Sequence, residues 1–234
     1  MDRDAPLADG TDTDRIAELE EDNRRLRRLL DQQGAPGELR HRLRSTLSLL
    51  RAIIRKSANT ARDLPAYVAH LDDRLEAIAR AQHFADQYGE VGLRTLLADE
   101  LLHYGASEGR NLLLSGPDVR LQPKAGQVMA LAVHELAVNS VEHGVLGSEH
   151  GRIEVSWIVA DPAPDGPQLA LTWTEHGLAP DNHPADGGFG TEVLTRMLPY
   201  DLQAKTAIAF TDGTLRCTVR FPLPEPVGRV VPSG

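Results

Sequence analysis

The sequence predicts an α+β fold, in which a helical N-terminal part precedes a domain of mixed helices and strands. Two observations lead to this class. Up to about residue 88, apolar residues recur at spacings of three and four, which is typical of amphipathic helices. Beyond residue 92, helical patterns are mixed with four runs of alternating apolar and polar residues, which are typical of half-buried strands. An α/β sandwich, with helices on one face of a mostly antiparallel sheet, accounts for this second part.

Composition limits the classes of function. The 234 residues, of which 41% are hydrophobic and 25% charged, suit a soluble globular protein with one ordinary domain and a helical appendage. A net charge of −9, without a patch of Lys and Arg interleaved with aromatic residues, argues against nucleic acid as a partner. No apolar run reaches the length of a membrane span, and the acidic start "MDRDAPLADG" does not resemble a signal peptide. We therefore expect a cytoplasmic protein, and the single Cys217 excludes an internal disulfide.

The first segments are expected to be a disordered lead-in over residues 1–12 and a coiled-coil helix over residues 13–31. Alternating steps of three and four residues along this helix connect Ile16, Leu19, Asn23, Leu26 and Leu30. A buried Asn23 would favour a two-stranded coil. The alternative is a short amphipathic helix that packs on its own chain.

A break at "DQQGAPG" separates this helix from two further amphipathic helices within residues 38–88. The two helices are expected to form an antiparallel hairpin, and dimerisation would cover their remaining apolar surface by making a four-helix bundle. His41 lies about 160° around the first helix from the apolar Leu43, so its side chain is expected to face water. On geometry alone, a solvated surface histidine needs no function.

The second domain is predicted to cover residues 92–224 and to contain a long helix with two different faces. Its apolar face consists of Met129, Ala132, Val133, Leu136, Ala137 and Ser140. The other face carries Glu135, Asn139, Glu142 and His143 in the stretch "HELAVNSVEHGVLG". Glu135 and Asn139 are one turn apart and supply the oxygen ligands that Mg²⁺ prefers beside phosphates. A solvated helix face is the alternative interpretation.

The predicted strands are "GRIEVSWIVAD", "QLALTWTEHG", "KTAIAFTDG" and "TLRCTVRFPL". Between the second and third lies "GGFGTEVLTRMLPYDL", in which Gly187, Gly188 and Gly190 precede or open a helix near Thr191. Glycines allow close approach of the backbone to a ligand, and the free N–H groups at a helix start attract a phosphate. An ordinary loop explains the glycines equally well. Residues 225–234 are expected to be a tail.

Four separated motifs, in the right order, resemble one family. "HELAVNSVEHG" resembles the N box of histidine-kinase ATPase domains, "WTEHG" resembles the Trp-x-Glu signature of the HWE class, and "GGFGTEVL" resembles its following glycine box. "LRHRLRSTLSLLRAI" is similar to the phosphoacceptor segment of that class. His134, Trp173 and Glu175 match the three residues that name the class. The resemblance runs from about Glu38 to Pro224.

The resemblance implies a role for each matching residue. His41 would be the phosphoacceptor, Asn139 would hold Mg²⁺, and Glu135 would assist as a catalytic residue. Glu175 would recognise the adenine amino group of ATP, while Trp173 is favoured as a packing residue. The full set implied for the nucleotide is His134, Asn139, His143, Glu175, Gly177, Gly188, Phe189, Gly190 and Thr191, with Asn139 as the metal ligand.

The sequence also departs from the family pattern. Glu142 stands where the family usually has a lysine beside the phosphates, and the lid "HGLAPDNHPADGG" contains no Lys or Arg. Leu178 occupies a place where the class often has a second glycine. Ser45 replaces the asparagine four residues after the acceptor histidine, which puts phosphatase activity in doubt.

Three functions follow, in decreasing order of weight. The first is a histidine kinase that autophosphorylates His41 from ATP and Mg²⁺ and passes the phosphoryl group to the receiver domain of a response regulator. It would be a homodimer through the hairpin and coiled coil, with no sensory domain of its own and input from a separate sensor protein. The second is a histidine phosphotransferase whose degenerate ATPase-like domain no longer binds nucleotide. The third is a binding module that sequesters a partner.

Overall fold

The computed structural model describes residues 20–22, 24–25, 46–54, 64–148, 151–160, 166–178 and 189–232. The chain divides into two compact units, Met1–Leu75 and Glu76–Gly234. Within the predicted coiled-coil segment, the described residues 20–22 and 24–25 are helical. The apolar seam of that segment, His41, Ser45 and Gly188 lie outside the described residues, so the coiled coil and the dimeric bundle stay predictions.

In the first unit, the described residues fit a helical hairpin. Residues 46–54 are helical and bury Leu47, Leu49, Ile53 and Ile54. The next helix, α3 (Leu64–Tyr88), begins in this unit, and the Tyr67 hydroxyl donates a hydrogen bond of 3.5 Å to the carbonyl of Ile54. The contact joins the two helices that the sequence predicts as a pair.

The second part of α3 belongs to the second unit. From Glu76 on, α3 buries Ala77, Ile78, Ala81 and Ala85 at spacings of one, three and four residues. The domain predicted to start at residue 92 is therefore part of a compact unit that starts 16 positions earlier, at Glu76.

The second unit is an α+β fold, as predicted. After α3 its elements are β1 (Val91–Gly92), α4 (Leu93–His103), β2 (Leu112–Ser115), β3 (Val119–Leu121), α5 (Pro123–Glu142), β4 (Arg152–Ala160), β5 (Gln168–His176), α6 (Phe189–Glu192), the π-helical turn η1 (Val193–Met197), α7 (Leu198–Leu202), β6 (Lys205–Thr211), β7 (Thr214–Pro222) and β8 (Gly228–Val230).

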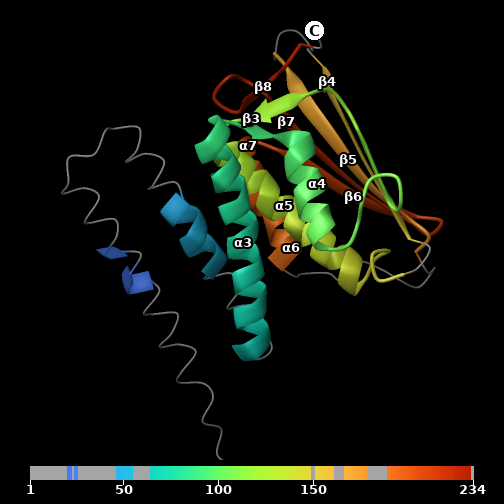
Figure 1. Cartoon of the computed structure of the whole chain (residues 1–234), viewed down its shortest axis with the longest axis horizontal. Coiled ribbons are helices and arrows are strands. Elements are labelled where there is room, and N and C mark those ends of the chain that lie inside the picture. The colour runs from blue at the N-terminus through green and yellow to red at the C-terminus, as the bar shows by residue number, and fades with distance from the viewer. Residues whose placement is uncertain are drawn as a thin grey trace, which may run out of the picture. The chain divides into compact units, whose positions relative to one another are not determined.

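A five-stranded sheet has the order β2-β4-β5-β7-β6, in which β2 and β4 are parallel and the other pairs antiparallel. Figure 1 shows α4 and α5 together on one side of this sheet. The four strands predicted from alternation are β4, β5, β6 and β7. The inward residues of β4, β5 and β7, such as Val155 and the opposite Trp173, are buried and form the core with the helices, whereas every residue of the edge strand β6 is at least partly exposed.

A second, small sheet of β1, β3 and β8 was not predicted. Its strands have only two or three residues, too few for an alternation pattern to show. β8 lies in the segment predicted to be a tail, where Arg229 forms a paired contact with Glu90, at 3.0 Å from Nε and 2.8 Å from Nη2.

The central helix α5 begins with Pro123 in its first turn, where the missing N–H of proline costs no hydrogen bond. The apolar face predicted for this helix is buried, and so are His134 and Glu135, at 2% and 3% exposure. Burial therefore surrounds the helix for most of its length. Exposed surface returns from Val138 on, and Leu136 and Asn139 line a cavity.

Candidate functional site

A cavity of about 610 Å³, including its open mouth, lies at the C-terminal end of α5. It is lined by Leu136, Asn139, His143, Gly144, Glu175, Leu178, Thr191, Leu194, Ile208, Leu215 and Cys217. Most of these side chains are apolar, and the polar ones come from α5, β5 and the start of α6. This is the composition of a site for a small molecule with a flat apolar part.

Glu175 is the most completely held polar group of the cavity. It is 1% exposed, and its Oε1 accepts a hydrogen bond of 2.9 Å from Trp173 Nε1. Its Oε2 accepts from the Ser140 hydroxyl at 2.9 Å and from the Val145 N–H at 3.1 Å. Burial raises the pKa of Glu175 above its ordinary value, although these three hydrogen bonds act in the opposite direction. The carboxylate can accept further bonds, since two oxygens offer about four lone-pair sites.

The buried Trp173 thus combines the packing role expected from the sequence with a hydrogen bond that orients Glu175. Ser140 and Val145, which complete the support, were not predicted as site residues. Ser140 was assigned to the apolar face of α5, where a small hydroxyl in an otherwise apolar stripe was the available signal. Val145 donates through its backbone, and no side-chain pattern reveals such a contact.

Asn139 and Glu135 lie beside Gly190, the glycine near the start of α6. A Cβ atom added to Gly190 would lie 3.0 Å from Asn139 Nδ2 and 3.3 Å from Glu135 Oε2. The absence of a side chain at position 190 therefore lets the α6 backbone approach the polar face of α5. Asn139 also lines the cavity, whereas Glu135 is buried next to it.

The described lining of the cavity contains no Lys or Arg. His143 lines it and lies with its Nε2 3.6 Å from Glu142 Oε2, both side chains being about half exposed. Thr191 lines the cavity from α6. A polyphosphate at this mouth would depend on a divalent cation and on backbone N–H groups for charge neutralisation.

The floor of the cavity contains Cys217 of β7 together with Leu215 and Ile208. Burial raises the pKa of the Cys217 thiol to about 12, so it stays protonated and unreactive near neutral pH. The thiol therefore acts as a small apolar wall element.

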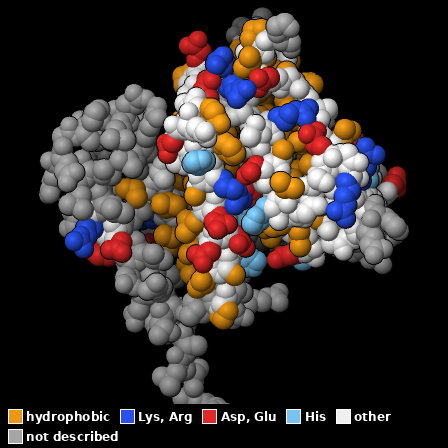
Figure 2. Space-filling model, in the orientation of Figure 1, with side chains coloured by type: hydrophobic (Ala, Val, Ile, Leu, Met, Phe, Trp, Pro, Cys, Tyr) orange, Lys and Arg blue, Asp and Glu red, His pale blue; other side chains and the backbone are white. Residues whose placement is uncertain are grey.

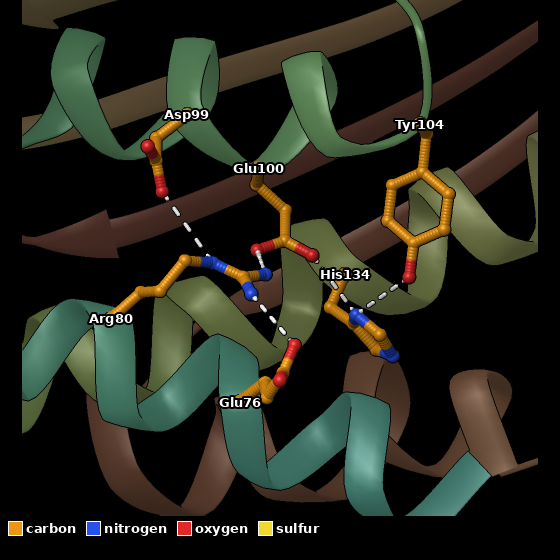
Figure 3. Close-up of polar contacts among 6 residues, drawn as sticks. All are labelled: Glu76, Arg80, Asp99, Glu100, Tyr104 and His134. Atoms are coloured by element: carbon orange, nitrogen blue, oxygen red, sulfur yellow. Dashed lines mark hydrogen bonds and ion pairs between the residues drawn. The ribbon is translucent and has the colours of Figure 1, made fainter. Parts of the chain in front are cut away.

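Of the predicted nucleotide set, four described residues do not line the cavity. His134 faces α4, where its Nδ1 lies 2.9 Å from Glu100 Oε1 and 3.0 Å from the Tyr104 hydroxyl (Figure 3). Phe189 and Gly190 are buried at the start of α6, and Gly177 is exposed just after β5.

A resident metal ion has limited support from protein side chains alone. The described part of the chain has no cluster of three or more His, Cys, Asp or Glu side chains that could hold one. Asn139 and Glu135 fit Mg²⁺ only as partial ligands, with phosphate oxygens and water completing its six-fold shell.

No helix in the described ranges is long and apolar enough to cross a membrane. On the face in Figure 2, the acidic and basic side chains are interspersed.

Comparison with known proteins connects this geometry to a family. Residues 38–118 match the family model of the HWE histidine kinases. The chain is related to the HWE histidine kinases. It is 29% identical over 191 residues to a blue-light-activated histidine kinase of Rhizobium johnstonii, an alignment that covers 81% of this chain and 53% of that protein. The corresponding values for blue-light-activated histidine kinase 1 of Erythrobacter litoralis are 28% over 203 residues, 83% and 54%.

Solved structures show the same fold. The histidine kinase domain of the Erythrobacter litoralis blue-light-activated kinase EL346 superimposes with a TM-score of 0.54 at 17% identity, covering 91% of this chain and 96% of that one. The HWE segment itself begins before α3 and ends before α5, whereas the cavity is formed by α5 and later elements. The chain spans about half the length of the curated relatives it matches.

Proposed function

We propose that this chain is a protein-histidine kinase that phosphorylates its own His41 from Mg-ATP and passes the phosphoryl group to an aspartate of a response-regulator receiver domain. The observation that supports this most is the placement of Glu175, buried and held by three donors in the same cavity that Asn139 lines. A fixed acceptor beside an apolar slot suits the amino group and ring of adenine.

In this proposal, the adenine ring lies among the apolar lining, and its amino group donates to a remaining lone pair of Glu175. Asn139 would offer its side-chain oxygen to Mg²⁺, and Glu135 would lie close enough to assist. The ion, when bound, neutralises charge on the phosphates that are transferred. The neutral imidazole of His41 would attack the γ-phosphorus, forming a nitrogen–phosphorus bond as the bond to the ADP oxygen breaks.

The relatives suggest the surroundings of the reaction. Because blue-light-activated kinases are among them, a sensor unit would supply the input, either in the same protein or as a partner. A homodimer through the hairpin and the segment 13–31 would present His41 to the ATP site. The product of such kinases is a phosphohistidine, whose phosphoryl group passes to a receiver aspartate as the nitrogen–phosphorus bond breaks and the imidazole leaves.

The test is incubation of the purified chain with γ-labelled ATP and Mg²⁺, scored as acid-labile label on the protein. We expect label on the wild type and none on His41→Ala or Asn139→Ala. The matched control is His83→Ala, which removes an exposed histidine of α3 and should leave labelling unchanged. Label that persists in His41→Ala would contradict the assignment of the acceptor.

A second candidate is a phosphotransferase that keeps the fold without binding ATP. It is favoured by the acidic Glu142 beside the lining residue His143 and by the absence of Lys and Arg from the described lining. In that case the wild type takes no label from ATP, but a phosphorylated receiver still passes its phosphoryl group to His41. The same purified proteins decide between the two candidates.

A further inference from the structure

Outside the cavity, a chain of charged side chains connects three helices of the second unit (Figure 3). Arg80 on α3 donates from Nη2 to Glu100 Oε2 on α4. The other oxygen of Glu100 lies 2.9 Å from Nδ1 of His134 on α5. Glu100 and His134 are 3% and 2% exposed, so the contact between these two side chains is shielded from water. Buried charged groups of this kind are retained only where partners hold them.

Glu100 determines which ring nitrogen of His134 carries the hydrogen between them. An ionised carboxylate can only accept hydrogen bonds, so the hydrogen between His134 and Glu100 resides on Nδ1. Burial raises the pKa of Glu100, but the hydrogen bonds and charges of His134 and Arg80 outweigh burial and hold that pKa below its ordinary value. Glu100 is therefore ionised at neutral pH, and the ring of His134 is held with Nε2 directed away from Glu100, as Figure 3 shows.

His134 immediately precedes Glu135, and neighbouring residues of a helix point about 100° apart. His134 therefore faces α4, while Glu135 faces Gly190 at the start of α6. The contact between His134 and Glu100 consequently sets the rotation of the α5 turn that carries Glu135. Asn139 lies on the next turn of the same helix.

Arg80, unlike His134, is partly exposed to solvent and has more than one carboxylate beside it. The Arg80 side chain is 27% exposed and also lies 3.5 Å from Glu76 Oε2 and 3.4 Å from Asp99 Oδ2. Both alternative carboxylates are more exposed than Glu100, at 65% and 40%. Glu76 moves with Arg80 because both lie on α3, so a small shift of α3 away from Glu100 would still leave the charge of Arg80 paired.

We propose that Arg80 and Glu100 are positioning residues of the ATP site, which hold the His134 turn of α5 in the orientation that phosphoryl transfer requires. The inference rests on the proposed kinase function. Since α3 is one continuous helix from Leu64 to Tyr88, a change in the setting of α3 reaches the ATP site through Arg80. The contacts of Arg80 and Glu100 would thus couple the position of α3 to the rate of phosphoryl transfer rather than to nucleotide affinity.

The test compares the full-length wild type with Arg80→Gln, Arg80→Lys and Glu100→Gln. For each protein we would measure the dissociation constant and binding capacity for a fluorescent ATP analogue, the melting temperature, and the initial rate of labelling at saturating Mg-ATP. The matched control is Arg229→Gln, which breaks an Arg–Glu contact in the small sheet.

We expect Arg80→Gln and Glu100→Gln to slow labelling about 10- to 100-fold, as misplacement of reacting groups does. Nucleotide affinity should stay within about twofold of wild type, because the lost interaction acts in the transition state. Arg80→Lys should recover most of the rate, and Arg229→Gln should keep it. Full binding capacity would show that the slow variants are folded.

Three results would overturn the inference. Equal labelling of wild type and Arg80→Gln would refute it alone and leave the kinase function intact. A rate that falls only in proportion to nucleotide affinity or binding capacity would reduce Arg80 to a structural residue. Absence of label on the wild type itself would remove the proposed function and this inference together.

Discussion

Glu175 remains in a nearly dry environment because three hydrogen-bond donors surround it. Trp173 Nε1 supports one oxygen, and the Ser140 hydroxyl and the Val145 N–H support the other. An adenine amino group would be a fourth donor at a carboxylate that is already oriented. Such an arrangement favours recognition, because no side chain has to reorganise when the ligand arrives.

The raised pKa of Glu175 leads to opposite pH dependences for stability and binding. Because the folded-state pKa lies above the unfolded one, the contribution of Glu175 to stability is present below the unfolded pKa and is lost as pH rises through the folded pKa. Nucleotide binding should strengthen over that same rise, since the ionised form is the better acceptor. Titration with a fluorescent ATP analogue at several pH values would measure this dependence.

Glu175→Gln should remove this pH dependence and weaken binding by about 1–3 kcal/mol, because the amide NH₂ faces a donor. The control is Glu154→Gln on β4, whose side chain is 41% exposed and faces outward. An unchanged pH profile in Glu175→Gln would assign the dependence to another group.

At the scale of single elements, α5 and α6 meet where Gly190 has no side chain. Gly190→Ala would place a Cβ atom 3.0 Å from Asn139 Nδ2, so the amide has to move by a few tenths of an ångström. We expect binding of Mg-ATP to weaken about 10-fold or more, a cost of at least about 1.4 kcal/mol, while the melting temperature changes little. Isothermal titration with and without Mg²⁺ would measure the loss.

Gly92→Ala is the matched control for this substitution. Its Cβ atom would be equally crowded, at 3.2 Å from Thr95 Oγ1 and 3.3 Å from Arg120 Nη1, but at the small sheet. A similar loss of Mg-ATP binding in both variants would show that the effect is general and not due to Asn139.

The same elements show what the sequence could predict. The long periodic helices and the strands β4, β5 and β7 were predicted because their buried faces repeat over several turns or residue pairs. The edge strand β6 was predicted from its alternating residue types, although none of its residues is buried. The π-helical turn η1 was not predicted, although Pro199 indicates that the regular hydrogen-bond pattern of an α-helix is interrupted there. Proline has no N–H to donate to the carbonyl of Thr195 four positions earlier, and the hydrogen bond from Leu198 reaches back five residues to Val193.

For the site, the resemblance of two motifs to one family assigned Asn139 and Glu175 to the same ligand, and both residues line one cavity. The resemblance also placed His134 in the nucleotide set, but His134 does not line the cavity. A histidine one position before Glu135 looks from the sequence like part of the polar face, and only the fold reveals Glu100 and Tyr104 beside it. Contacts between residues 34 and 30 positions apart leave no mark on local spacing.

At the scale of the whole molecule, the boundary between the two units falls inside a helix. The sequence places it in the turn after residue 88, because glycine and charge interrupt the helical pattern there. The contacts place it at Glu76, since Arg80 and Gln82 bond to α4 and α5 and the apolar side of α3 is buried up to Ala85. Helical periodicity cannot show which partner a helix packs against.

Two truncated chains distinguish these boundaries. A fragment of residues 76–234 retains Arg80 and the buried side chains of α3, whereas a fragment of residues 92–234 loses them and leaves Glu100 and Gln127 without their α3 partners. Burial of Ile78 and the charged bond to Glu100 together predict a difference of at least about 3 kcal/mol in the free energy of unfolding. Urea denaturation followed by circular dichroism would measure it. The longer fragment should also keep the nucleotide affinity of the full chain without taking label, because it lacks His41. Equal unfolding midpoints would instead place the boundary after α3 and leave Arg80 with no stabilising part in the second unit.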